Sequence, residues 1–334
     1  MHILAMEVQA DAAASASARY IAFAIQGNLQ AAPPLFESLP ANGAPTDREL
    51  AARFRERFVD RTEAPAPSSG NALVDRVVAT YRAYWRDTLM GSAVDAAAED
   101  RLLTSLMASL QDAGEAVGER APPDAYALLA PALQRQGFHA LASQAAPLQD
   151  LFVWRHQEVD IFEVALPDQV RRVQVAFLSD FASLGWKHYA SLGLATTTGW
   201  VDGDTLYCVE WAYAPGTENF DVSYLKHETQ HLADFERFPG LSSAELEYRA
   251  KLTELAFASN TLRRLLDDFS AKGAPNPDSP HAEANWRVVR AVYEALYGEE
   301  PVGDVSWAAV DVGRVNRVAR RLLAEDTARL EGRL

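Results

Sequence analysis

Cysteine is almost absent from this chain, since Cys208 is the only one among its 334 residues. A single cysteine cannot form a disulfide within the chain, which excludes a small secreted scaffold stapled by disulfides. Cys208 lies in the apolar run LYCVEW, where a buried and unreactive thiol is the expected state. The fold must therefore depend on a hydrophobic core, for which apolar residues making up 49% of the chain are sufficient.

Long apolar runs and an excess of basic residues are also missing. No run approaches the roughly eighteen apolar residues of a membrane-spanning helix. The first residues carry Glu7 and no basic residue before an alanine-rich stretch, unlike a secretory signal. A formal net charge of −15 disfavours binding to phosphate backbones and anionic lipids. The sequence thus predicts a cytoplasmic protein with no nucleic-acid or membrane partner.

The pattern of apolar residues changes near residue 150. Before it, segments 47–61 and 71–90 repeat apolar residues with a helical period, and loops rich in proline and glycine separate them. We therefore expect a helical N-terminal domain over residues 1–150 and a second domain over residues 151–334.

The second part alternates strand and helix patterns. Segments near 159–167 and 170–181 have strand character, and a hairpin is expected around Asp202-Gly203. Asn219 or Asp221 is a plausible cap for the helix that follows, and further helices are expected over 241–273, 281–297 and 306–330. The predicted fold class is α+β: mostly helical, with a small antiparallel sheet preceding a helix that carries the motif HETQH.

HETQH, residues 227–231, matches the pattern H-E-x-x-H. Residues four apart lie on one face of a helix, so His227 and His231 can converge on one zinc ion. Glu228 lies beside them, where it can act as the general base toward a water that the metal activates. The motif therefore predicts a hydrolytic zinc site.

A third protein ligand is needed, and the following helix offers Glu245, Glu247 and Glu254. Only FPGLSS separates the two helices, so they must pack closely. Glu247 is preferred, because it borders the apolar surface next to the small residue Ala250. Glu254 lies on the same face and could brace the second nitrogen of a histidine.

Asp234 and Glu245 have simpler interpretations. Asp234 is two turns from His227, about 10 Å along the helix axis, too far to share the ion; a solvated carboxylate is the preferred reading over a partner behind the ligands. Glu245 stands near the start of its helix, where a negative charge interacts favourably with the helix dipole.

With HETQH followed by a glutamate on the next helix, residues 205–255 resemble the gluzincin zinc metallopeptidases, the thermolysin-like group. The resemblance implies zinc bound by His227, His231 and Glu247, with Glu228 as base. Lys251 departs from the thermolysin pattern, which has an aspartate there, so no particular family is implied. The resemblance also suggests that LYCVEWAYA is an edge strand that pairs with an extended substrate, although a purely structural strand is equally compatible.

Stabilising a developing oxyanion requires a hydrogen-bond donor. His281 is the one histidine after the motif and is our candidate, with Tyr248, Arg249, Tyr213 and Tyr224 as alternatives; a surface histidine near a helix cap is the simpler reading. The four remaining histidines have no ligand-like neighbours and are expected to be structural: His2, His139, His156 and His188.

The sequence therefore predicts a zinc-dependent metallohydrolase, specifically a metallopeptidase acting on a peptide or protein, with the oligomeric state left open. The alternative is a non-enzymatic helical binding or scaffold protein with a structural or degenerate metal site.

Overall fold

In the computed structural model, the described residues are 2–5, 15–39, 44–65, 67–91, 96–117, 124–145, 147–277, 279–303 and 305–332. Within these ranges the chain is α+β and mostly helical, as predicted. It forms two compact units. The C-terminal unit contains β1 and residues from 158–177 and 198–334, and the N-terminal unit contains residues from 8–157 and 178–197.

These units do not follow the single boundary expected at residue 150. The chain passes between them after Gln157, Phe177 and Thr197. The first two of these points fall inside β3 (Leu148–Ala165) and β4 (Val170–Leu184), so both long strands continue from one unit into the other. A local composition shift marks the change from helices to strands, but it does not show how far a strand extends.

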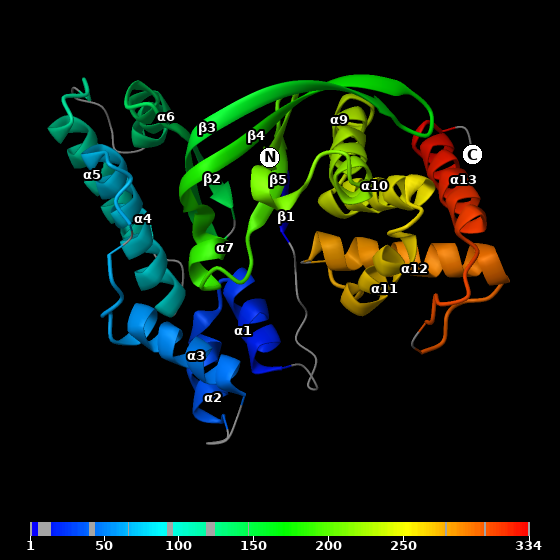
Figure 1. Ribbon diagram of the computed structural model, residues 1–334, viewed down its shortest axis with the longest axis horizontal. Coiled ribbons are helices and arrows are strands. Elements are labelled where there is room, and N and C mark those ends of the chain that lie inside the picture. The colour runs from blue at the N-terminus through cyan, green and yellow to red at the C-terminus, as the bar shows by residue number, and fades with distance from the viewer. Residues whose placement is uncertain are drawn as a thin grey trace. The chain divides into compact units, whose positions relative to one another are not determined.

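The N-terminal unit is built mainly of helices, drawn from blue to green in Figure 1. Its core surrounds α4, whose Tyr81, Trp85 and Leu89 are almost fully buried. Its elements are α1 (Ala16–Ile25), η1 (Leu29–Ala31), α2 (Ala32–Glu37), α3 (Pro45–Phe54), the π-helical η2 (Arg55–Val59), α4 (Ala72–Met90), α5 (Ala96–Asp112), α6 (Ala125–Arg135), β2 (His139–Ala145) and α7 (Gly185–Ala190).

In the C-terminal unit, strands precede a group of helices; apart from the blue β1, its elements are drawn from green to red in Figure 1. Its elements are β1 (His2–Ala5), β5 (Thr197–Asp202), β6 (Thr205–Val209), η4 (Glu210–Ala212), α8 (Glu218–Phe220), the π-helical η5 (Asp221–Lys226), α9 (His227–Arg237), α10 (Ser243–Phe257), α11 (Leu262–Lys272), α12 (Pro280–Tyr297) and α13 (Val312–Leu330). None of the helices in the described ranges is both long and apolar enough to cross a bilayer.

The strands form one sheet in the order β1-β5-β6-β4-β3-β2. The predicted hairpin is confirmed: β5 and β6 pair antiparallel, with Asp202 opposite Thr205. The prediction of a small antiparallel sheet is wrong, because the sheet is mixed and curled and contains two strands of 18 and 15 residues. β6 also has a neighbour on each side, so the LYCVEWAYA segment does not supply an edge strand for a substrate.

α10 is the central helix of the C-terminal unit. Eleven of its 15 residues are buried, on all sides of the helix, because α9, α12 and α13 pack around it. On the other side of α9, Leu232 and Ala233 join a second apolar cluster with residues of the sheet, including Cys208. Cys208 is buried, as expected, and its burial raises the pKa of the thiol to about 12.

The single helix predicted over 241–273 is in fact two, because the chain leaves helical geometry at Ala258 (ψ 140°). The side chain of Glu218 explains the break. Its carboxylate accepts six hydrogen bonds of 2.7–3.1 Å from the backbone and side chains of Ser259, Asn260 and Thr261. These donors would otherwise be left without partners where the helix ends.

We predict that Glu218→Gln lowers stability in a pH-dependent way. Burial alone would raise the pKa of Glu218, but its hydrogen bonds outweigh burial and lower the pKa to about 2. A depressed carboxyl pKa stabilises the fold above the usual pKa, and this contribution is lost as pH falls toward 2. Because the side chain is partly exposed, we expect a loss of about 1–2 kcal/mol at pH 7.

Urea denaturation at several pH values measures this effect. The difference in unfolding free energy between wild type and Glu218→Gln should shrink as pH falls from 5 to 3. Glu299→Gln, at an exposed position, is the matched control and should leave stability unchanged. A difference that is constant across this pH range would contradict the role assigned to the Glu218 carboxylate.

Candidate metal centre

The HETQH motif lies on α9, whose N-terminal extension begins at Thr217. The Thr217 hydroxyl caps α8 by accepting a hydrogen bond from the amide of Phe220 at 3.3 Å, and helical geometry then continues through η5 into α9. The predicted cap at Asn219 or Asp221 is therefore wrong by two residues or more. Thr217 is a good N-cap residue, but the π-helical turn hides its helical register in the sequence.

α10 begins with a capping box. Ser242 accepts a hydrogen bond from the Glu245 amide, and the Glu245 carboxylate accepts one from the Ser242 amide at 2.9 Å. This confirms the reading of Glu245 as a residue of the helix start. Its carboxylate is engaged there, leaving Glu247 and Glu254 as the two glutamates of α10 beside the histidines.

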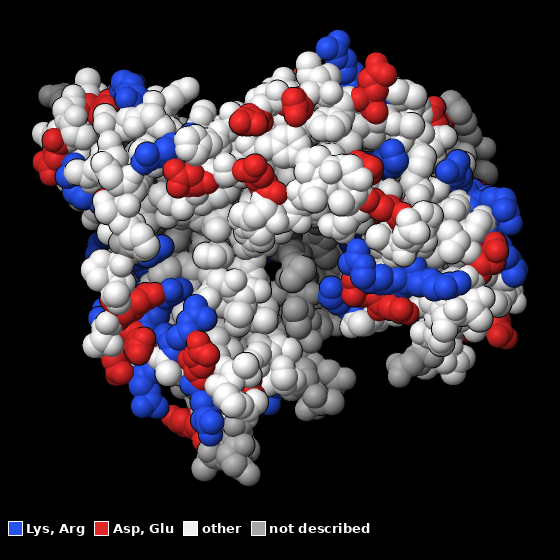
Figure 2. Space-filling model, in the orientation of Figure 1, with Lys and Arg blue, Asp and Glu red and all other residues white. Residues whose placement is uncertain are grey.

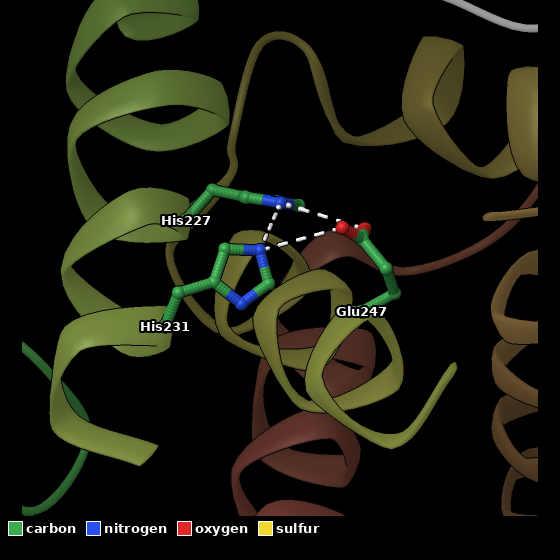
Figure 3. Close-up of side chains that lie close together, drawn as sticks. All are labelled: His227, His231 and Glu247. Atoms are coloured by element: carbon green, nitrogen blue, oxygen red, sulfur yellow. Dashed lines mark hydrogen bonds and ion pairs between the residues drawn. The ribbon is translucent and has the colours of Figure 1, made fainter. Parts of the chain in front are cut away.

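His227, His231 and Glu247 meet between α9 and α10, all 4% exposed or less. Figure 3 shows both imidazoles pointing from α9 toward the Glu247 carboxylate on α10. The two Nε2 atoms lie 3.1 Å apart, and Glu247 oxygens lie 3.4 Å from His231 Nε2 and 3.6 Å from His227 Nε2. Ligands about 2.1 Å from a tetrahedral zinc ion are separated from one another by about 3.4 Å.

Glu254 lies directly behind the first histidine. Its Oε1 is 2.8 Å from His227 Nδ1, the nitrogen that faces away from the cluster. A carboxylate in this position fixes the ring orientation and leaves Nε2 for a metal. The structure thus places Glu254 where the sequence suggested a bracing residue.

Two further buried polar pairs join α9 to α10. Thr253 donates a hydrogen bond to Gln230 at 2.9 Å, and Arg249 Nε donates one to Asp234 at 2.9 Å. The prediction that Asp234 is solvated is wrong, because the residue is 1% exposed. Along these two pairs and the His227–Glu254 pair, residue numbers rise on α9 while they fall on α10, so the two helices are antiparallel. These pairs hold an antiparallel register that brings Glu247 to the histidines.

Glu247 is surrounded by positive or potentially positive groups. His281 Nδ1 lies 3.0 Å and Lys251 Nζ 3.6 Å from its Oε2. Burial alone would raise the Glu247 pKa, but His281, His231 and His227 together hold it well below its usual value. The sequence reading missed the pairing with Lys251, which the spacing of four residues along one helix could have indicated.

The pKa values of the two candidate histidines are shifted in opposite directions. Burial is the largest influence on both and favours the neutral ring. The pKa of His227 is lowered, since burial outweighs the hydrogen bond that the ring donates to Glu254, which raises the pKa. For His231, contact with Glu247 outweighs burial and raises the pKa.

Glu228 is the candidate base and is 1% exposed. Its Oε1 has no hydrogen-bond partner among the described residues. Burial raises its pKa to about 8, with His231 opposing the shift and Glu247 and Glu254 adding to it. An orphaned buried carboxylate oxygen beside two histidines is costly unless a positive charge or a donor is supplied from outside the chain.

A pocket of about 310 Å³ reaches the cluster. Its wall includes His227, Glu254, His281, Tyr213 and Lys251. Glu228, His231 and Glu247 are not among its lining residues. Among the alternative oxyanion donors, only Tyr213 lines the pocket; its hydroxyl is 3.3 Å from Thr198.

The other three alternative donors are not among the residues that line the pocket. Arg249 pairs with Asp234 and with Asp326. The Tyr248 ring packs against Arg287, and Tyr224 belongs to the apolar cluster between α9 and the sheet.

No protein-family model, curated protein or solved structure matches the chain. The interpretation of the site therefore depends on the chemistry of its own residues.

We predict that the purified protein binds about one zinc ion per chain and that His231→Ala abolishes this binding, because two remaining protein ligands hold zinc poorly. Glu254→Gln should keep all three ligands but weaken zinc binding by about 10- to 100-fold, since the ring of His227 loses its charged brace. Elemental analysis and competition with a chelator measure both effects.

Glu245→Gln is the matched control, because it changes a glutamate of the same helix that only caps its start. It should bind zinc like wild type. Equal zinc affinity in wild type and His231→Ala would contradict the assignment of the cluster as a metal site.

Proposed function

We propose that this protein is a zinc-dependent hydrolase that cleaves peptide bonds, with zinc held by His227, His231 and Glu247. The observation that carries the proposal is the separation of the three ligand atoms, 3.1–3.6 Å, which suits a tetrahedral zinc ion. The adjacent Glu228 gives this ligand set a base, which a purely structural zinc site does not need.

A zinc ion in this site would supply Lewis acidity, lowering the pKa of the attacking water and polarising the substrate carbonyl. Glu228, as a carboxylate, would take a proton from that water as its oxygen bonds to the carbonyl carbon. Glu228 would then deliver the proton to the amide nitrogen as the C–N bond breaks. The pocket at His227 and His281 is the access route that this chemistry requires.

His281 has two possible contributions in this scheme. Its contact with Glu247 suits a residue that orients a ligand, and its position on the pocket wall suits an oxyanion donor, the role expected from the sequence.

The second candidate is a structural metal site in a non-enzymatic protein. The deep burial of Glu228, His231 and Glu247, each 4% exposed or less, favours it. The two candidates differ in what Glu228 does, since a structural site has no use for a base.

We predict that Glu228→Gln reduces kcat for peptide cleavage by about 10²- to 10⁴-fold, because the amide cannot accept the proton of the attacking water. Zinc content should stay at the wild-type level. The assay is cleavage of a mixed peptide library by the zinc-loaded protein. Glu236→Gln, an exposed change on the same helix, is the control and should retain activity. Zinc-loaded wild type with no peptide cleavage would favour the structural candidate.

For His281→Ala, we predict a fall in kcat of about 10²- to 10³-fold if the side chain donates to the oxyanion. Zinc content would then be unchanged. Loss of zinc in parallel with activity would instead assign His281 to holding Glu247. Measuring kcat and zinc content on the same preparation separates these roles.

A further inference from the structure

Arginines from three helical segments of the N-terminal unit gather at the end of α7. Arg57 of η2 donates to the Tyr189 carbonyl at 2.7 Å and lies 4.6 Å from the centre of the Tyr189 ring. Arg82 of α4 lies 5.8 Å from the same ring centre, and Arg53 of α3 donates to the Leu192 carbonyl at 2.6 Å. In Figure 2, basic and acidic side chains share the visible surface of this unit, at the lower left.

Two pockets adjoin at Arg82 and Tyr189. The first, of about 350 Å³, is lined by Arg53, Arg57, Arg82 and His188 among other residues, and none of its lining residues is acidic. The second, of about 590 Å³, adds Arg86 and has apolar walls that include Pro65, Val78 and Ala79. Both volumes are in the range of pockets that bind small organic ligands, about 300–1,000 Å³.

The acidic groups nearby are already engaged. Glu63 accepts two hydrogen bonds of 2.8 Å from Arg57 Nε. Asp75, in the second pocket, accepts hydrogen bonds from Ser68 and Ser69. The two pockets together are lined by five arginines (Arg53, Arg57, Arg76, Arg82 and Arg86) and two carboxylates (Glu63 and Asp75), so positive charges exceed negative charges there by three.

Arg82 and Arg86 contribute to this excess of positive charge. Among the described residues, Arg82 has no hydrogen bond or ion pair, and Arg86 Nε is buried without a hydrogen-bond partner. Burial lowers the Arg82 pKa, and the charge of Arg57 lowers it further. The pKa of His188 falls for the same reasons, through burial and then through Arg57 and Arg82. Grouping partly buried cations in this way is unfavourable unless an anion joins them.

We propose that the two pockets form one binding site for a small organic phosphate monoester. Its phosphate would lie against Arg53, Arg57 and Arg82, and its apolar or aromatic body would extend toward Val78 and Ala79. A guanidinium group can donate two parallel hydrogen bonds to phosphate oxygens, and a phosphate dianion offsets more of this excess positive charge than a single carboxylate does. The chain as a whole carries a net charge of −15, so this group of arginines is opposite in sign to the overall charge of the protein.

Isothermal titration of the full-length protein tests this site, with phenyl phosphate, inorganic phosphate, benzoate and phenol as probes. We expect phenyl phosphate to bind at least about tenfold more tightly than benzoate, because it offers twice the charge, and phenol not to bind. Inorganic phosphate should bind more weakly than phenyl phosphate, since it lacks the apolar body.

Arg82→Gln should weaken phenyl phosphate binding at least about tenfold, through loss of a charge-assisted contact. Arg55→Gln is the matched control: it removes the same charge from an exposed position of η2 that lines neither pocket, and should change affinity less than about twofold. Arg82→Lys keeps the charge without the planar fork and should give an intermediate loss.

Absence of phenyl phosphate binding to wild type at millimolar concentration would overturn the proposal. So would equal binding of phenol, or equal weakening by Arg55→Gln and Arg82→Gln. If Arg82→Gln does not fold, the comparison of the four probes on wild type decides the outcome alone. The readout requires no peptidase activity and no zinc, so its failure and that of the proposed hydrolase are distinguishable.

Discussion

The antiparallel packing of α9 on α10 is the constraint on which the candidate metal centre depends. Three buried polar pairs hold it: His227–Glu254, Gln230–Thr253 and Asp234–Arg249. Polar pairs in a dry interface act as a register device, because sliding either helix by one turn would leave every member without its partner. With the register set, Glu247 can only face His227 and His231.

The same packing explains why so many ionisable groups can be buried together. α9 packs against the sheet through Leu232 and Ala233 and against α10 on its other side, so all five residues of the motif are almost fully buried. Groups in such a place need partners, and most have them: Glu247 has His281 and Lys251, and Arg249 has Asp234 and Asp326. Among the described residues, Oε1 of Glu228 has no hydrogen-bond partner, and a cation next to it would compensate the charge of its carboxylate.

The N-terminal unit has the opposite electrostatic character at the end of α7. There Arg57 and Arg82 lie against the Tyr189 ring, and the arginines that line the two pockets outnumber the carboxylates Glu63 and Asp75. Each unit thus contains a concentration of charge that its own residues do not balance: a carboxylate and histidine cluster in one, and an arginine cluster in the other. Such imbalances are costly in a folded protein and are characteristic of places where a ligand completes the structure.

The sequence alone determined the local features of this protein. The spacing of His227 and His231 on one helical face, the Asp202-Gly203 hairpin and the α+β class all follow from periodicity and turn chemistry within short segments. It also offered three glutamates of the next helix as candidates for a third metal ligand, because the connection between the helices is short.

Only the tertiary structure decided what depends on residues distant in the chain. Glu218 breaks the helix predicted over 241–273 from more than forty residues away. β4 pairs with β6, so β6 is not the edge strand that the family resemblance suggested. The long β3 and β4 each pass from one unit into the other, so no single boundary near residue 150 divides the chain. The arginine cluster likewise joins α3, η2 and α4 to residues that follow β4. Helical period and turn chemistry act over a few residues, whereas burial and charge pairing depend on which segments meet in space.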